Sequence, residues 1–302
     1  MRHAPRYPVY IPSKGRAAQP LTIRLFERAG VPFIVAVQPD QVEAYAEWKD
    51  KLFVLPENGK GLVYARNAIR DHAQASGAAR HWQFDDDIRN MTRLYYGHKL
   101  SVNAGIALAA MEDFCDRYEN VGLCSPNSEF FIPASRGRSF QEWKPFTLNS
   151  RCYTAFLMLN AMPYRWRFNY NEDTDMTLQV LAGGRCTILF NHFLIKTEWT
   201  ESNATHSKKA GGQAAVYAAD GRLKMARQLE RVWPGVVKTI RRFGRPQHQV
   251  ASSWRKFDNK LVRRSDIDWT ALEAGGNDEY GMELKGSPGD SVVQRVRRLR
   301  HA

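Results

Sequence analysis

The strongest constraint on the fold is a regular alternation of apolar runs and helical patterns over the first ninety residues. Such alternation, with helices of 10–15 residues, is typical of βαβ units and a mostly parallel sheet. We therefore predict an α/β, Rossmann-type mixed sheet flanked by helices. The predicted strands lie in residues 7–16, 32–40, 51–57 and 81–88, and the predicted helices in 21–30, 41–50 and 61–77.

The pattern changes towards the C-terminus. A basic, mainly helical region is predicted over 217–245, and the sequence after Asp266 is polar and weakly patterned. We therefore expect three parts: a catalytic domain over 1–215, a basic helical extension over 216–265 packed on it, and a small appendage over 266–302. Before the change, we predict helices in 102–118 and 170–184 and strands in 121–127, 152–160 and 186–199.

Composition limits the class of protein. With 43% hydrophobic residues the chain can bury a core, and disorder would require far fewer. No run approaches the ~20 apolar residues that span a bilayer, and the N-terminus lacks the apolar stretch of a signal peptide. The cysteines lack metal-binding spacing and indicate reduced thiols in a cytoplasmic protein: Cys115, Cys124, Cys152 and Cys186.

Positive charge is concentrated near the C-terminus. The net charge is +13, and residues 222–302 contain 18 Lys/Arg against 9 Asp/Glu, or +9. Clustered cations bind polyanions by releasing counterions, which favours a nucleic acid partner. Surface charge that only maintains solubility is the alternative.

Polar motifs lie at the carboxyl ends of three of the predicted strands. They are "SKGR" (13–16), "QPD" (38–40) and "DDD" (85–87). Ligands of open α/β sheets bind beyond the carboxyl ends of the strands, so these motifs should converge on one crevice.

The three adjacent aspartates require a counter-charge. Unpaired carboxylates at a buried strand end raise one another's pKa, and Mg²⁺ or Mn²⁺ would relieve the repulsion. Mg²⁺ sites usually include substrate phosphates, which Lys14, Arg16 and Arg66 could also meet. Neither a P-loop nor a GxGxxG motif is present. Alternatively, the aspartates cap the next segment or pair with Arg89 and Arg93.

The order of these motifs resembles a known family. A strand ending in "IPSKGR", then "GLVYARN", "FDDDI", "NEDTD" and the histidine of "THSKKAGG" are similar to GT-A-fold nucleotide-sugar glycosyltransferases. More narrowly, the chain resembles the phage-encoded TET-associated DNA glycosyltransferases, and "FGRPQHQVASSWRKF" adds to that match. The resemblance spans roughly residues 7–257.

The resemblance implies roles for the donor side. Asp87 and Asp85 would bind Mn²⁺ or Mg²⁺, and His206 would complete the metal shell. Lys208 and Lys209 could neutralise the leaving diphosphate. The donor, expected to be a UDP-sugar, would contact Pro12, Ser13, Lys14, Arg16, Gln38, Asp40, Gly61, Arg66, Asn67, Asp85, Asp86 and Lys208.

The motif "NEDTD" resembles the acceptor-side acidic motif of the same enzymes. Asp173 is the first choice as general base and Glu172 the second, whereas Asp175 more simply stabilises the start of a helix. Direct displacement would invert the anomeric configuration, and a retaining route remains equally open.

The expected acceptor is DNA. Aromatic residues alternate with cations in the basic region, where they could stack on a base or pack in the core; for any single aromatic we favour the core. The family resemblance implies the hydroxymethyl group of 5-hydroxymethylcytosine as nucleophile. Residues 125–144, with Phe130, Phe131, Arg136 and Arg138, would border the acceptor groove or cover the donor. The predicted DNA contacts are Arg241, Arg242, Arg245, Arg255 and Lys256.

We therefore predict a metal-dependent glycosyltransferase that modifies DNA in the cytoplasm of a phage-infected bacterium, with neither a membrane nor a protein partner. A glycosyltransferase whose acceptor is a glycan, a lipid or a protein is a second hypothesis. A nucleotidyltransferase or nuclease is a third, and a non-catalytic DNA-binding protein is a fourth.

Overall fold

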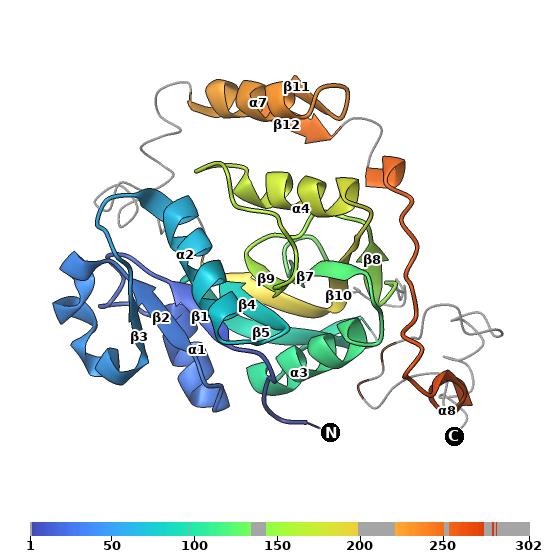
Figure 1. Cartoon of the computed structure of the whole chain (residues 1–302), viewed down its shortest axis with the longest axis horizontal. Helices are drawn as coiled ribbons and strands as arrows, with labels where there is room; N and C mark the ends of the chain where they lie inside the picture. The colour runs from blue at the N-terminus through green and yellow to red at the C-terminus, as the bar shows by residue number, and fades with distance from the viewer. Residues whose placement is uncertain are drawn as a thin grey trace.

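A central ten-stranded mixed sheet organises the molecule (Figure 1). The computed structural model describes residues 2–95, 97–133, 143–198, 221–250, 254–274, 280 and 282. The main strand order is β3-β2-β1-β4-β9-β7-β10-β5-β6, and β8 pairs with β10. The strands are β1 (Val9–Pro12), β2 (Ile34–Val37), β3 (Leu52–Val54), β4 (Arg80–Phe84), β5 (Ile88–Tyr95), β6 (His98–Ser101), β7 (Val121–Ser128), β8 (Phe146–Leu148), β9 (Ala155–Leu159) and β10 (Cys186–Thr197).

The N-terminal half of the sheet is parallel, as predicted. Strand β1 lies between β2 and β4, with Tyr10 opposite Ile34 and Val9 opposite Trp82. Strands β4 and β9 are antiparallel, and so are β10 and β5. The GT-A-like α/β class is therefore confirmed. The strands β5 and β6, which directly follow the aspartates, were not predicted.

Helices cover both faces of the sheet (Figure 1). Helices α1 and α3 lie on one face, and α2 and α4 lie on the other. Among the described helices, none is both long and apolar enough to cross a bilayer. The helices are α1 (Leu21–Ala29), α2 (Gly61–Ala75), α3 (Ala104–Cys115), α4 (Glu172–Ala182), α7 (Gly221–Val232) and α8 (Trp269–Ala274), with 3₁₀ segments η1 (Pro39–Gln41), η2 (Glu43–Lys51) and η3 (Trp254–Lys256).

The helix predicted over 41–50 is wrong in type. The chain instead forms η1 and η2, and non-helical backbone angles interrupt η2 at Tyr45 and Trp48. Both side chains are buried. The Trp48 indole donates to Glu27 at 2.9 Å, and the Tyr45 hydroxyl lies 2.7 Å from Ser13 Oγ. The apolar pattern of residues 41–50 would also fit a regular helix. The tertiary contacts of Tyr45 and Trp48 instead stabilise the two 3₁₀ segments.

The continuous basic helix predicted over 217–245 is wrong beyond Val232. Helix α7 ends there, and β11 (Val237–Arg242) and β12 (Arg245–Val250) form an antiparallel hairpin. Pro234 and Gly235 stop the helix, and β-branched residues after them favour a strand. The hairpin and α7 pack over α4 through an apolar cluster that includes Leu178, Leu229 and Val237 (Figure 1).

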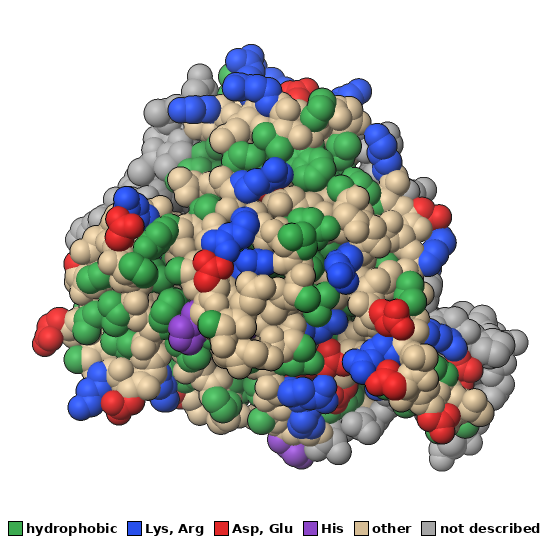
Figure 2. Space-filling view, in the orientation of Figure 1, with side chains coloured by type: hydrophobic (Ala, Val, Ile, Leu, Met, Phe, Trp, Pro, Cys, Tyr) green, Lys and Arg blue, Asp and Glu red, His purple; other side chains and the backbone are tan. Residues whose placement is uncertain are grey.

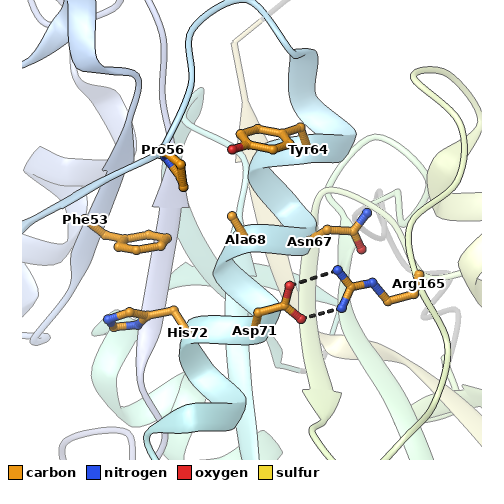
Figure 3. A pocket seen from close by; sticks show the side chains of 8 residues that line it. All are labelled: Phe53, Pro56, Tyr64, Asn67, Ala68, Asp71, His72 and Arg165. Carbon is orange, nitrogen blue, oxygen red and sulfur yellow. Dashed lines mark hydrogen bonds and ion pairs between the residues drawn. The ribbon is translucent and has the colours of Figure 1, made fainter.

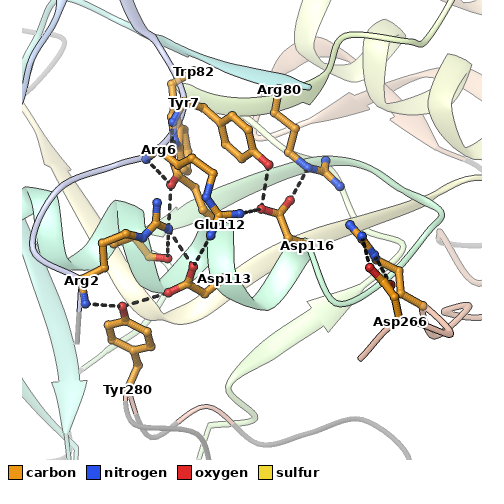
Figure 4. A network of polar contacts seen from close by, with 12 residues as sticks. Arg2, Arg6, Tyr7, Arg80, Trp82, Glu112, Asp113, Asp116, Asp266 and Tyr280 are labelled. Atoms are coloured by element: carbon orange, nitrogen blue, oxygen red, sulfur yellow. Dashed lines mark hydrogen bonds and ion pairs between the residues drawn. The ribbon is translucent and has the colours of Figure 1, made fainter. Parts of the chain in front are cut away.

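A buried polar network holds the N-terminal segment against α3 (Figure 4). The fully buried Glu112 carboxylate accepts the Trp82 indole N–H at 2.9 Å and the Arg6 amide at 2.7 Å. The Tyr280 hydroxyl donates to Asp113 at 3.0 Å. Tyr280 and Met282 also belong to the main core, so the polar tail contributes buried residues. All four cysteines are buried and free, as reduced thiols should be.

Candidate functional site

The predicted motifs after β1 and β4 meet at the carboxyl edge of the parallel strands. The Ser13 hydroxyl donates to Asp86 Oδ2 at 2.6 Å, and Arg16 Nε lies 3.0 Å from Asp86 Oδ1. Because β1 and β4 are parallel neighbours, their following loops share this edge. The convergence predicted for "SKGR" and "DDD" is therefore present.

A buried arginine neutralises the first aspartate. Arg66 of α2 lies 2.6 Å from Asp85 Oδ1, and its guanidinium is 5.0 Å from the Phe156 ring centroid and 4.9 Å from that of Trp166. The Arg66 side chain is only 1% exposed. Arg66 is thus a counter-ion enclosed by aromatic rings. It can influence a bound phosphate through Asp85 more readily than by direct contact.

The turn that carries the aspartates is fixed by contacts that the sequence did not indicate. The Thr22 hydroxyl donates to the Asp85 carbonyl at 2.7 Å and accepts the Ile88 amide at 2.9 Å. The Asp85 amide donates to the Thr154 carbonyl at 2.9 Å, and Thr154 has a left-handed φ of 66°. Thr22 of α1 and Thr154, the residue before β9, therefore fix the conformation of the turn.

Asp87 differs from Asp85 and Asp86 in having a buried oxygen that no described residue satisfies. Its buried Oδ1 has no hydrogen-bond partner among the described residues. Burial, followed by the charges of Asp85 and Asp86, raises the pKa of Asp87 to about 7. Arg89, the alternative partner, is ion-paired with Glu198. An orphaned oxygen in a cluster of acids suits a divalent cation.

The described residues do not by themselves form a complete metal site. No group of three or more His, Cys, Asp or Glu side chains that could hold a metal lies among them. The predicted ligand His206, like Lys208 and Lys209, lies outside the described residues. A Mg²⁺ site needs only one or two carboxylates when phosphate oxygens complete it, so Asp87 and Asp85 fit that role.

Two other predicted donor residues stabilise the loops beside the crevice. The Gln38 side chain accepts the Gly59 amide at 3.2 Å, and the Asn58 side chain accepts the Asp40 amide at 3.1 Å. These bonds tie the loop after β2 to the loop before α2. Gly61, at the start of α2, has a φ of +82°, which a side chain would strain.

The remaining predicted donor residues differ in availability. Lys14 is exposed and Pro12 is buried at the end of β1. The Asn67 side chain donates to the Trp166 carbonyl at 2.9 Å and accepts the Trp166 amide at 3.1 Å. Asn67 thereby positions the segment that encloses Arg66, and its amide group is already engaged.

The predicted acceptor-side acids begin helix α4. Asp173 is ion-paired with Arg151 through Oδ2, and its Oδ1 accepts the Thr174 amide at 2.6 Å. Burial, the charge of Asp173 and that of Asp85 raise the pKa of Glu172 to about 8, against the opposing charge of Arg66. Asp85 therefore acts electrostatically on the first residue of α4.

Asp175 has a structural role in the first turn of α4, as the sequence favoured, but it binds side chains rather than capping the helix. It is fully buried and accepts Arg167 Nε at 2.9 Å and Gln179 Nε2 at 2.9 Å. The Trp233 indole donates to it at 2.8 Å. Asp175 therefore connects α4 to its preceding loop and to the segment after α7.

His248 of the hairpin lies beside the acceptor-side acids and was not predicted. Its Nε2 is 3.3 Å from Thr174 Oγ1, which also lies 3.3 Å from Asp173 Oδ1. Burial and the Arg151 charge lower the pKa of His248 to about 4, so its ring is neutral near pH 7. Only the unexpected hairpin brings it here, which is why the sequence did not reveal it.

The predicted DNA-binding cations gather on one end of the molecule. Arg241, Arg242 and Arg245 are exposed on the hairpin, and Lys256 is exposed on η3. Lys and Arg side chains are frequent in Figure 2 over the region where Figure 1 places α7 and the hairpin. The side chain of Arg255 and residues Arg136 and Arg138 lie outside the described parts.

The aromatic residues of the basic region divide into two groups. Trp233, Trp254 and Phe257 pack against the cluster between α4 and the hairpin, in agreement with a core role. Phe243 is instead 82% exposed. Outside the basic region, Phe130 in the segment 125–144 is also exposed, at 72%.

A cavity of about 400 Å³ lies along α2, outside the predicted crevice (Figure 3). Phe53, Tyr64 and His72 contribute its aromatic wall, and Asp71 and Arg165 pair across one side. Of the predicted site residues, only Asn67 lines it. The acidic motifs at the sheet edge do not line this cavity.

Comparison with known proteins identifies the family. A family model described as TAGT, TET-Associated Glycosyltransferase, matches residues 7–206, more than half of the chain. The chain belongs to this family. The part matched to the TET-associated glycosyltransferases contains both acidic motifs and Arg66, and it ends before the hairpin that carries His248.

Further comparisons are less informative. No curated protein matches the chain. Among solved structures, that of mannose-1-phosphate geranyltransferase from Thermus thermophilus is similar, with 13% sequence identity and a TM-score of 0.31. The match covers 76% of this chain and 64% of that one, which is less than two thirds of its length. Nothing about function follows from so weak a similarity.

Proposed function

We propose that this TET-associated glycosyltransferase transfers a sugar from a nucleotide-sugar donor to a hydroxyl group on a modified base in DNA, with a divalent cation at the acidic crevice. The observation that carries the proposal is Asp87 Oδ1, which has no hydrogen-bond partner among the described residues and follows two ion-paired aspartates, of which Asp85 also acts electrostatically on Glu172. The aspartates suit a cation bound to a diphosphate donor, and Glu172 suits a hydroxyl acceptor.

Asp87 and Asp85 would hold Mn²⁺ or Mg²⁺, with His206 as the further ligand implied by the family. The cation, when bound, supplies positive charge to the diphosphate that leaves. Lys14 is exposed at the same edge and can approach a phosphate. Arg16 and Arg66 are already paired with carboxylates, so they limit the negative charge that a phosphate meets.

The contacts favour Glu172 over Asp173 as the proton acceptor. Both Asp173 oxygens are engaged, with Arg151 and with Thr174. Burial and neighbouring carboxylates raise the pKa of Glu172 to about 8, which makes its carboxylate a stronger proton acceptor than an ordinary one. Asp173 then acts as a positioning residue that fixes Arg151 and the start of α4.

In a direct displacement, the acceptor oxygen bonds to the anomeric carbon of the sugar. The bond from that carbon to the diphosphate oxygen breaks, and its electron pair stays on the diphosphate. The acceptor proton passes to Glu172. This route inverts the anomeric configuration, and the stereochemistry of the product provides a direct check.

The position of the basic hairpin supports a DNA acceptor. Hairpin and α4 share an apolar cluster, and His248 touches Thr174. The exposed cations can therefore contact phosphates while the bound nucleic acid lies next to Glu172 and Asp173. Hydroxymethylcytosine, the base implied by the family, would supply a primary alcohol as nucleophile.

The decisive experiment is incubation of the protein with UDP-sugars, Mn²⁺ and DNA that contains hydroxymethylcytosine. Mass spectrometry of the digested nucleosides should show the modified base heavier by one sugar. DNA with ordinary cytosine is the matched control and should remain unchanged. If folded, metal-loaded protein gives no product with any nucleotide-sugar tested, the proposal is wrong.

Labelled donors distinguish the alternative chemistries. Label in the sugar should enter DNA, whereas label in the nucleotide should remain in the released diphosphate. Transfer of nucleotide label to DNA would instead indicate a nucleotidyltransferase. If the protein transfers sugar to a glycan or a protein and has no affinity for DNA, the proposed acceptor is wrong. The proposed donor chemistry would then still hold.

A further inference from the structure

The tip of the β11–β12 hairpin has an unusual residue for its conformation. Arg242 pairs with Arg245, so Phe243 and Gly244 alone make the turn. Their φ values are 52° and 70°. Two-residue turns with positive φ at both positions favour Asn-Gly or Gly-Gly, and bulky residues rarely adopt positive φ. A phenylalanine here is conformationally costly, and such strain is common at functional sites.

The Phe243 ring has almost no contact with the body of the protein. It is 82% exposed, more than any other large hydrophobic side chain among the described residues. The Arg242 guanidinium lies 5.0 Å from its ring centroid. Burial in the core therefore cannot explain this phenylalanine, in contrast to Trp233 and Phe257.

The surroundings of the ring are cationic. Lys238, Arg241, Arg242 and Arg245 are exposed on the hairpin, and residues 237–250 include no Asp or Glu. An apolar protein partner would have to desolvate these charges, whereas DNA phosphates would neutralise them. An aromatic ring among cations suits a nucleic acid, since the ring can enter the base stack while the cations contact the backbone.

The hairpin is anchored to the helix that carries the acceptor-side acids. Val237 packs with Leu178 of α4, and His248 touches Thr174. Five residues separate Phe243 from His248, so the tip lies at most roughly 17 Å along the strand from that contact, at about 3.3 Å per residue. The tip and Glu172 can thus engage the same short stretch of duplex.

We propose that Phe243 is a wedge that enters the base stack of duplex DNA next to the target pyrimidine and holds open the space left by its extrusion. The inference rests on the proposed function, because a base inside a duplex must leave the stack before its hydroxymethyl group can reach an active site. Phe243 acts on the duplex, and Glu172 acts on the extruded base.

The test uses two substitutions at the tip. Phe243→Asn removes the ring and installs the Asn-Gly pair that this turn prefers, so the hairpin should be at least as stable. Phe243→Trp retains a stacking ring. The control is Arg28→Ala, an exposed arginine on α1 at another face of the molecule. Thermal unfolding should confirm that every variant is folded.

The first measurement requires no sugar donor. The full chain is mixed with duplex DNA in which 2-aminopurine adjoins hydroxymethylcytosine. Wild type, Phe243→Trp and Arg28→Ala should raise the fluorescence by unstacking the probe. Phe243→Asn should leave it near that of free duplex and weaken duplex binding by roughly 5- to 150-fold, the range measured for lost base–aromatic stacking.

The second measurement compares single-turnover rates on a paired and on an unpaired target. Phe243→Asn should lower the duplex-to-unpaired rate ratio by about tenfold or more. A wild-type protein that does not unstack the probe, or an Asn variant with the wild-type fluorescence and rate ratio, would overturn the wedge. Loss of unstacking in Phe243→Asn, without sugar transfer by any form, would support the wedge and refute the proposed reaction.

Discussion

At the scale of single residues, the described part of the site contains more carboxylates than cations. Arg16 pairs with Asp86, Arg66 with Asp85, and no such partner for Asp87 lies among the described residues. Such an imbalance raises pKa values and disfavours the folded state unless a ligand supplies positive charge. The protein therefore tolerates a local electrostatic cost at the point where a donor complex would bind.

Asp87→Asn should remove turnover while the fold is retained. The substitution preserves shape but withdraws the charge that would hold the cation, so we expect transfer to fall by about 10²- to 10³-fold. Activity against Mn²⁺ concentration and circular dichroism would check this. Asp266→Asn, at an exposed ion pair with Arg264, is the matched control and should keep full activity. An active Asp87→Asn enzyme would contradict the metal assignment.

Glu172→Gln should stabilise the metal-free protein at high pH only. The ordinary pKa of Glu172 is 4.5 and its folded value is about 8, so the folded state prefers the protonated form. This preference costs nothing below pH 4.5, grows as pH rises, and levels off above pH 8. Glutamine carries no charge at any of these pH values, so the variant does not bear this cost.

Urea unfolding with EDTA would measure this difference. Near pH 8 the variant should be more stable than wild type by roughly 4 kcal/mol, and near pH 4 the two should be equal. Its sugar transfer should nevertheless be lost if Glu172 accepts the proton. Equal gains in stability at both pH values would show that burial of the charge is not the cause.

At the scale of elements, α4 connects the sheet with the basic hairpin. Its first turn carries Glu172 and Asp173, and its buried Asp175 binds both Arg167 and Trp233. Its apolar side packs on the hairpin through Leu178. A displacement of the hairpin would therefore be transmitted to the acceptor-side acids.

Asp175→Ala should weaken this connection. Loss of a fully buried acceptor leaves the Trp233 indole and the Gln179 amide without their partner, and we expect a cost of about 2–3 kcal/mol. Chemical denaturation followed by tryptophan fluorescence would measure it. Trp233→Phe, which removes only one of the bonds, should cost less. A variant as stable as wild type would show that the connection is not important for stability.

At the scale of the whole molecule, the carboxylates of the site and the exposed cations of the hairpin lie in different places. The acids converge at the sheet edge, while exposed cations extend over the hairpin at the end of the molecule (Figure 2). This division lets a polyanion approach the molecule from the hairpin end without meeting the carboxylates first.

The double substitution of Arg241 and Arg242 to Ala should flatten the salt dependence of DNA binding. Each phosphate contact contributes roughly 0.9 to the slope of log affinity against log salt, so two should reduce it by about 2. Fluorescence anisotropy over a salt series would measure the slopes, with Arg28→Ala as the control. An unchanged slope would place the DNA on another surface.

The sequence alone determined the parts of the molecule that follow local patterns. Apolar runs separated by helical spacing specified β1, β2 and β4, and their parallel pairing then required Ser13 and Asp86 to meet at one edge. The hydrophobicity and the period of each segment are sufficient to recognise these elements, because both can be read from neighbouring residues in the sequence. The family resemblance followed from the same motifs.

Only the tertiary structure decided how the side chains at these positions are used. It enclosed Arg66 between Phe156 and Trp166 as a counter-ion, and it engaged both oxygens of Asp173. It also turned an expected helix into a hairpin that places Phe243 at its tip. These outcomes depend on partners far away in the chain, whose packing energy exceeds the small local preferences that a sequence displays.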